Sequence, residues 1–174
     1  MDSNGYQKLA LKTESVSDGA LSLEESVVLP EYLEGAMRIG VYADKLKRSI
    51  FYGKHDSAIQ DVAIDIDEHT TLTIEESRMV HCVLGLVSES GESAEALYRS
   101  LVNGEEFDNV NFMEEMGDLL WYIAIGLNAA GVTMQQAMDS NIAKLKKRYP
   151  DGFRETDAVK RDMFAERQAL ALKG

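Results

Sequence analysis

The chain has 174 residues, of which 45% are hydrophobic, and carries a formal net charge of −12. This length is enough for one domain with a real hydrophobic core. The acidic balance argues against binding nucleic acid through its phosphates, because proteins that do so usually present a basic face. The sequence has no apolar run near the ~18 residues that a membrane span requires, and its start lacks the basic and apolar regions of a secretory signal. With one cysteine, Cys82, which cannot form an internal disulfide, these features predict a cytoplasmic protein.

The first half of the chain predicts two helices in an all-α fold. Only two prolines occur, and apolar residues recur at helical spacing. A short helix is expected over 3–13, with Ser3 as its N-cap. Residues 14–24 are rich in Ser, Asp and Gly and are expected to form a linker. A longer helix is expected over 31–52, followed by Gly53 as a C-cap.

The second half predicts four more helices. A loop is expected to about residue 72, and the strand-like alternation over 62–67 is taken as part of it. Thr73 and Glu76 form a capping-box pattern that opens a helix running to about Leu101. The remaining helices are predicted over 109–129, ended by Ala130 and Gly131, over 133–148, with Thr133 as the cap, and over 155–171.

Two pairs of carboxylates stand out within these helices. Glu89 and Glu92 are three residues apart, as are Glu115 and Asp118, and this spacing puts each pair on one helix face. The short connection at 103–108 makes the two helices antiparallel neighbours. At about 1.5 Å of rise per residue, the two pairs then lie at nearly the same height.

Four carboxylates brought together in this way favour a bound divalent cation. Burying them without a counter-charge would be costly. Hard cations such as Mg²⁺ prefer oxygen ligands and bring phosphate groups with them. The sequence therefore predicts a Mg²⁺ site, for which Mn²⁺ is expected to substitute, and a phosphorylated small molecule as its substrate.

The residues around these pairs resemble the MazG-like all-α nucleoside triphosphate pyrophosphohydrolases. Residues 86–95 are similar to the first metal motif of that family and residues 115–122 to the second. Residues 141–150, from Asn141 to Pro150, are similar to its substrate-side helix. The opening helix at 5–13 and the ending at 161–167 also fit, the latter as in phage-encoded members. Each motif alone is weak, but the opening helix, the two metal motifs and the substrate-side helix in the right order make the resemblance specific, and it covers 5–13 and about 73–170.

The resemblance implies a single all-α domain over 1–174 with an antiparallel four-helix-bundle core, and the cleavage of a nucleoside triphosphate to the monophosphate and pyrophosphate. The metal ligands would be Glu89, Glu92, Glu115 and Asp118, and Glu89 or Glu92 would orient or deprotonate the attacking water. A homodimer or a dimer of dimers is expected. dCTP, dUTP and dGTP all remain open as substrates, in dNTP-pool control for phage DNA synthesis. The residues implied in substrate binding are Asn141, Lys144, Arg148 and Tyr122.

The chain departs from the family pattern in two places. Ser88 stands where many relatives have an acidic residue before the first carboxylate pair. A helical insertion over 14–72 precedes the catalytic helices at 73–150 and the C-terminal helix at 151–174. The basic stretch 44–54 within the insertion resembles a segment that follows the first metal motif in phage relatives. It is either a duplicated helix pair or a relocated element.

Three other functions compete with this interpretation. A phosphoribosyl-ATP pyrophosphohydrolase has a similar helical-bundle architecture, but the Asn141–Lys144 spacing and the run ending at Pro150 favour the MazG-like branch. A non-catalytic helical interaction module would use the acidic surface for a partner. A di-iron redox bundle is disfavoured because its Glu-x-x-His motif is lacking.

Overall fold

The computed structural model describes residues 2–15, 22–54 and 72–170. Within these ranges all regular structure is helical, which confirms the predicted all-α class. The segment 62–67, His55 and His69 lie outside the described residues. Among the described helices, none combines the length and apolar character needed to span a bilayer.

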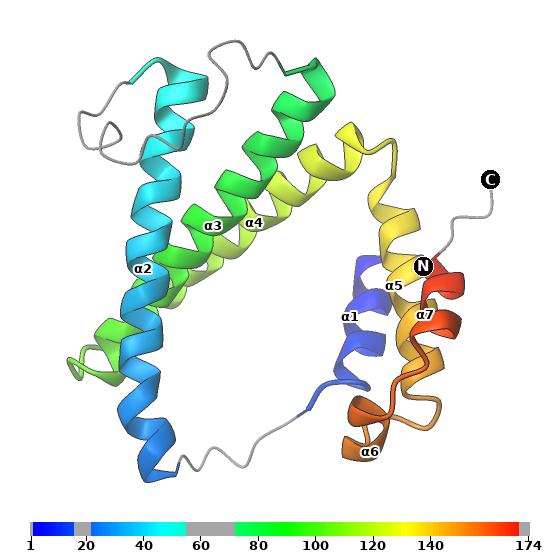
Figure 1. The fold of residues 1–174 in the computed structure, drawn as a ribbon. Coiled ribbons are helices and arrows are strands. Elements are labelled where there is room, and N and C mark those ends of the chain that lie inside the picture. The colour runs from blue at the N-terminus through cyan, green and yellow to red at the C-terminus, as the bar shows by residue number, and fades with distance from the viewer. Residues whose placement is uncertain (1, 16–21, 55–71, 171–174) are drawn as a thin grey trace. The chain divides into compact units, whose positions relative to one another are not determined.

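The chain divides into two compact units. One unit comprises residues 21–131, with helices α2 (Leu23–Tyr52), α3 (Ile74–Leu101) and α4 (Asn109–Ala129). In this unit α3 packs against both α2 and α4 (Figure 1). The other unit comprises residues 1–20 and 132–174, and its helices are α1 (Ser3–Leu11), α5 (Met134–Arg148), α6 (Glu155–Val159) and α7 (Met163–Leu170).

Helix α2 is longer than the sequence predicted. The expected start at residue 31 is wrong, because the helix begins at Leu23 and continues through Pro30. A capping box sets this start: the Ser22 hydroxyl accepts from the Glu25 amide at 3.2 Å, and the Glu25 carboxylate accepts from the Ser22 amide at 2.7 Å. The last residues of the expected linker 14–24 are therefore helical. Gly53 ends the helix with a φ of 63°, as predicted.

Small residues bring α2 and α3 unusually close. A Cβ atom added to Gly40 would lie 2.7 Å from the Cα atom of Gly91, a distance that no folded chain tolerates. Gly91 sits between the two glutamates of the first carboxylate pair. The crossing point of α2 is thus fixed at the level of that pair.

Helices α3 and α4 form the predicted antiparallel hairpin. Thr73 and Glu76 make the expected capping box at the start of α3. The ring of Tyr122 fills the space that a side chain at Gly85 would need, with 2.2 Å from the added Cβ to the ring. This interlocking fixes the height of α4 against α3.

The second unit is built on α5, which packs against α1 and α7. Thr133 caps α5 as predicted. The N-cap of α1 is Asp2 and not Ser3, because the Asp2 carboxylate accepts from the Gly5 amide at 2.7 Å. The expected single helix over 155–171 is wrong: it is broken into α6 and α7, and Asp162 caps the second piece through the Ala165 amide.

Candidate active site

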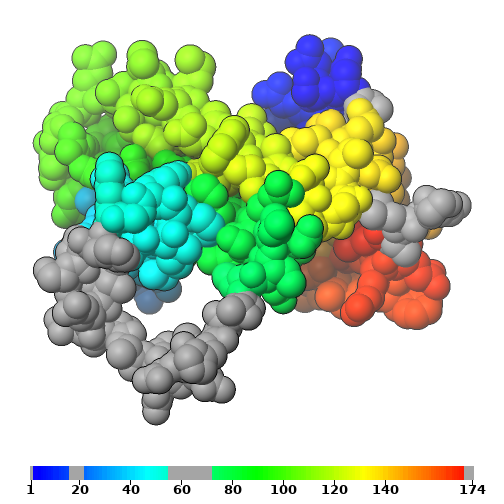
Figure 2. Space-filling view, turned by 90° about the horizontal axis from the view of Figure 1, so that it is seen from above, coloured from blue at the N-terminus to red at the C-terminus, as the bar shows by residue number. Residues whose placement is uncertain are grey.

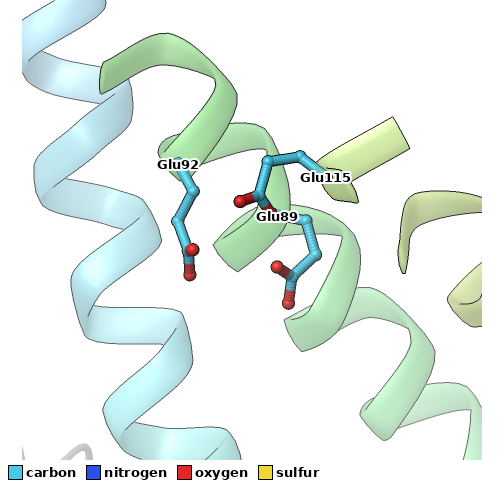
Figure 3. A group of neighbouring side chains, drawn as sticks. All are labelled: Glu89, Glu92 and Glu115. Atoms are coloured by element: carbon cyan, nitrogen blue, oxygen red, sulfur yellow. The ribbon is translucent and has the colours of Figure 1, made fainter. Parts of the chain in front are cut away.

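Three glutamates converge between α3 and α4. Glu89 and Glu92 project from α3 and Glu115 from α4 (Figure 3), and one carboxylate oxygen of each lies within 4.8 Å of the others. Glu89 and Glu115 are buried, whereas Glu92 is the exposed member. The structure therefore brings together three of the four residues that the sequence predicted as metal ligands.

Asp118, the fourth predicted ligand, is not part of this three-residue cluster. It lies one turn after Glu115 on α4 and is exposed. It is close enough to contribute to the raised pKa of Glu115. Residues three apart on a helix differ by about 60° in direction, so a buried Glu115 leaves Asp118 at the edge of the site.

The cluster concentrates negative charge. Burial raises the pKa of Glu115 to about 7, and the neighbouring carboxylates Glu89, Glu92 and Asp118 act in the same direction. The pKa of Glu92 is also raised, first by burial and then by Glu89 and Asp44. The site therefore favours any cation or proton that reaches it.

A buried lysine from α2 contacts the same cluster. Lys47 is 5% exposed, and its Nζ atom donates to Glu89 Oε1 at 3.0 Å and to Ser88 Oγ at 2.9 Å. It also lies 3.3 Å from Asp44 Oδ1 and 5.1 Å from the centre of the Tyr122 ring. Burial disfavours the charged form, but the contacts with Tyr122 and Glu89 outweigh it and raise the pKa of Lys47. Lys47 is therefore a fixed positive charge.

Ser88 explains how the departure from the family pattern is accommodated. It is 1% exposed, and its hydroxyl lies 2.9 Å from Glu89 Oε1 and 3.0 Å from the Gly85 carbonyl. A hydroxyl adds no charge next to Glu89. An acid at this position would place another carboxylate directly at the Lys47 ammonium.

The two adjacent aromatic residues on α4 differ in exposure. Tyr122, predicted to bind substrate, is only 5% exposed and packs beside Lys47. Trp121 is 52% exposed. His81 lies between them and α2, stacked on Phe51 at 4.1 Å between ring centres. The space-filling view shows the end of α2, in cyan, beside the green helix that carries His81 (Figure 2).

The other predicted substrate residues belong to the second unit. Asn141 accepts a long 3.5 Å hydrogen bond from the Tyr6 hydroxyl, and Lys144 is partly exposed on the same helix. Arg148 is held by a bidentate ion pair with Glu166 of α7, one arm of which is 3.0 Å long. This pairing gives Arg148 a structural task in α5–α7 packing.

Residues at the site fit a divalent cation. Their donors are carboxylate oxygens, the ligands that Mg²⁺ and Mn²⁺ prefer. Glu115 is buried, and its pKa is raised to about 7 by burial and by carboxylate neighbours that Lys47 only partly compensates. A cation held by Glu89, Glu92 and Glu115 would relieve this repulsion.

Sequence reasoning missed Lys47, although a signal was present. Small residues at Ala36, Gly40 and Ala43 mark one face of α2, and Lys47 continues the same stripe at helical spacing. A lysine on a buried face requires a counter-charge. The stretch 44–54 was interpreted through its resemblance to a basic segment of phage relatives, and no role was predicted for Lys47.

Comparisons with known proteins agree with the site. Residues 79–153 match the family model described as the MazG nucleotide pyrophosphohydrolase domain. This match includes both carboxylate pairs and α5 but not α2. Among curated proteins and solved structures, none matches the chain. Residues 79–153 are therefore similar to the MazG nucleotide pyrophosphohydrolase domain.

Proposed function

We propose that the protein is a Mg²⁺-dependent nucleoside triphosphate pyrophosphohydrolase, which releases pyrophosphate and a nucleoside monophosphate. The observation that carries this proposal is the convergence of Glu89, Glu92 and Glu115 within the matched domain. A dNTP is the proposed substrate class, in the control of nucleotide pools. Glu89, Glu92 and Glu115 would hold the ion, with Asp118 beside them.

When bound, Mg²⁺ supplies Lewis-acid polarisation of the phosphate oxygens and screens their charge. The residues of the chain contribute the proton chemistry and the positioning. Glu92 is the most exposed member of the cluster, and partial desolvation together with the charges of Glu89 and Asp44 raises its pKa, so it suits a general base. A water oxygen attacks the α-phosphorus, the bond from that phosphorus to the bridging oxygen breaks, and the water proton passes to Glu92. Pyrophosphate leaves with the bridging oxygen.

Substrate contacts outside the cluster remain proposals that rest on the resemblance. Asn141 and Lys144 on α5 are proposed to contact sugar and phosphate, and Tyr122 to line the site. The resemblance also implies Arg148 in substrate binding. Its ion pair with Glu166 means that phosphate binding by Arg148 would have to compete with an existing partner.

A homodimer is proposed from the exposed apolar side chains of α2 and α4. Tyr32 and Ile39 on α2 are 74% and 61% exposed, and Met113 and Trp121 on α4 are 72% and 52% exposed. Apolar side chains of this size at a surface favour association. Light scattering coupled to gel filtration measures the oligomeric state directly.

The test is pyrophosphate release from a panel of all canonical dNTPs and NTPs with Mg²⁺, Mn²⁺ or EDTA. We expect turnover of at least one dNTP that EDTA abolishes. Glu115→Gln should remove it, whereas Glu114→Gln, the exposed neighbour on the same helix, should retain it. Metal-independent turnover, or full activity in a folded Glu115→Gln variant, would refute the proposal.

A further inference from the structure

The ammonium group of Lys47 is surrounded by oxygen atoms at the carboxylate site. An ammonium has three N–H donors. Three oxygens surround it: Ser88 Oγ at 2.9 Å, Glu89 Oε1 at 3.0 Å and Asp44 Oδ1 at 3.3 Å. The side chain of Lys47 is 7% exposed. Lys47 is thus positioned as a charge that stays in place and not as a mobile surface group.

The backbone of α2 holds Lys47 at this position. Gly40, two turns earlier on the same face, touches the backbone of Gly91 in α3. Because neither helix has a side chain at the crossing, their separation is set by backbone contact. The crossing of α2 and α3 therefore determines the level along α3 at which Lys47 contacts Glu89.

The position of the ammonium limits how many metal ions fit. Two-metal phosphoryl-transfer sites place their ions about 3.5–4 Å apart, bridged by shared carboxylates. Glu89 is central to the cluster, but its Oε1 atom is already bonded to Lys47 Nζ and approached by Ser88 Oγ. A cation shared with Glu92 and Glu115 would then bind at the other oxygen of Glu89. A second ion at Oε1 would sit against a like charge.

We propose that Lys47 takes the place of a second metal ion, so that the site binds one divalent cation per chain. This inference rests on the proposed metal-dependent function. Lys47 belongs to α2, which lies outside the residues matched by the family. The charge would therefore come from a helix that lies outside the family match.

The test is a titration of the full chain with Mn²⁺, in which free Mn²⁺ is measured by electron paramagnetic resonance without nucleotide. We expect one Mn²⁺ per chain in the wild type. In Lys47→Met, which keeps the apolar stem, we expect a second Mn²⁺, or binding of the first that is tighter by about tenfold or more. Lys8→Met, an exposed lysine on α1, is the matched control and should titrate like the wild type.

Two results would overturn the inference while leaving the proposed function standing. They are two Mn²⁺ ions per wild-type chain, or a folded Lys47→Met variant with unchanged count and affinity. A wild-type chain that binds no Mn²⁺ would instead refute the metal-dependent function, and the inference with it. If Lys47→Met does not fold, the wild-type count decides, together with Lys47→Arg, which keeps the charge and should also bind one ion.

Discussion

Each unit contains a group of buried charges, and the neighbours of the buried glutamate differ between the two groups. In the second unit Glu166 is 4% exposed and is paired with two guanidinium groups, those of Arg148 and Arg161. In the first unit Glu115 is equally buried but faces other carboxylates. Hydrogen bonds from Arg148 and Arg161 lower the pKa of Glu166 to about 2, whereas burial and like charges raise that of Glu115 to about 7.

We interpret the difference as that between a structural ion pair and the proposed cation site. The Glu166 cluster is compensated within the chain, so it contributes to the packing of α7 on α5. Among the described residues, Lys47 is ion-paired with Glu89, and Arg48 acts on Glu92 through its charge, but the carboxylates of the Glu115 cluster outnumber these cations. An uncompensated carboxylate cluster of this kind supports the proposal of a bound cation.

The largest expected effects come from neutralising one acid in each unit, which tests whether the two clusters have different roles. Glu89→Gln should lower kcat/KM by at least about 10²-fold, because it removes charge at the reacting site, while helical circular dichroism stays unchanged. Glu166→Gln should lower Tm by several degrees, because two arginines lose their counter-charge. Activity assays and thermal melts on both variants measure the two effects, and Glu155→Gln, exposed on α6, is the control for the melt.

A result in which both variants lose stability equally and retain activity would contradict this assignment. It would mean that the two clusters serve the same structural purpose.

The helix crossing that sets Lys47 against Glu89 predicts an intermediate effect. Gly40→Ala should lower the free energy of unfolding by about 1–3 kcal/mol, because its methyl group would clash with the backbone of Gly91. Gly35→Ala, five residues earlier on α2 with open space around it, should raise the same quantity by about 0.5–1 kcal/mol. Urea unfolding of both variants measures the contrast. Equal values for the two would show that the close approach of α2 and α3 does not exist.

The smallest effect concerns pH. Between the ordinary value of 4.5 and about 7, the folded metal-free chain holds a proton on Glu115 that the unfolded chain has lost. The free energy of unfolding should therefore fall as pH rises through this window. Glu115→Gln removes the effect, so in EDTA the variant's Tm advantage over the wild type should be larger at pH 8 than at pH 5. His81 and Glu166 titrate in both chains, so their contributions cancel in the difference.

A Tm difference that does not change with pH would show that Glu115 does not sit among uncompensated carboxylates.

Much of the fold was predictable because local signals fix helix ends. The capping box at Thr73, the cap at Thr133 and the glycines after α2 and α4 were predicted correctly. The start of α2 was not, because the Ser22 capping box lies within the stretch that was expected to be a linker. The break between α6 and α7 was also missed, because the polar stretch around Asp162 has helical composition.

The candidate site was predictable as far as it depends on spacing within neighbouring helices. Glu89, Glu92 and Glu115 meet because an i,i+3 pair and a short connection leave little freedom. The place of Lys47 depends on a distant crossing of α2 over α3, and nothing in the spacing of the basic stretch 44–54 specifies that contact. The partner of Arg148 likewise comes from α7, 18 residues away.

The proposed cation site is tested by the anomalous difference density of a crystal soaked in Mn²⁺. We expect one peak per chain, coordinated by the carboxylates of Glu89, Glu92 and Glu115, with Lys47 Nζ still bonded to Glu89. A peak elsewhere, or no density among these three carboxylates, would contradict it.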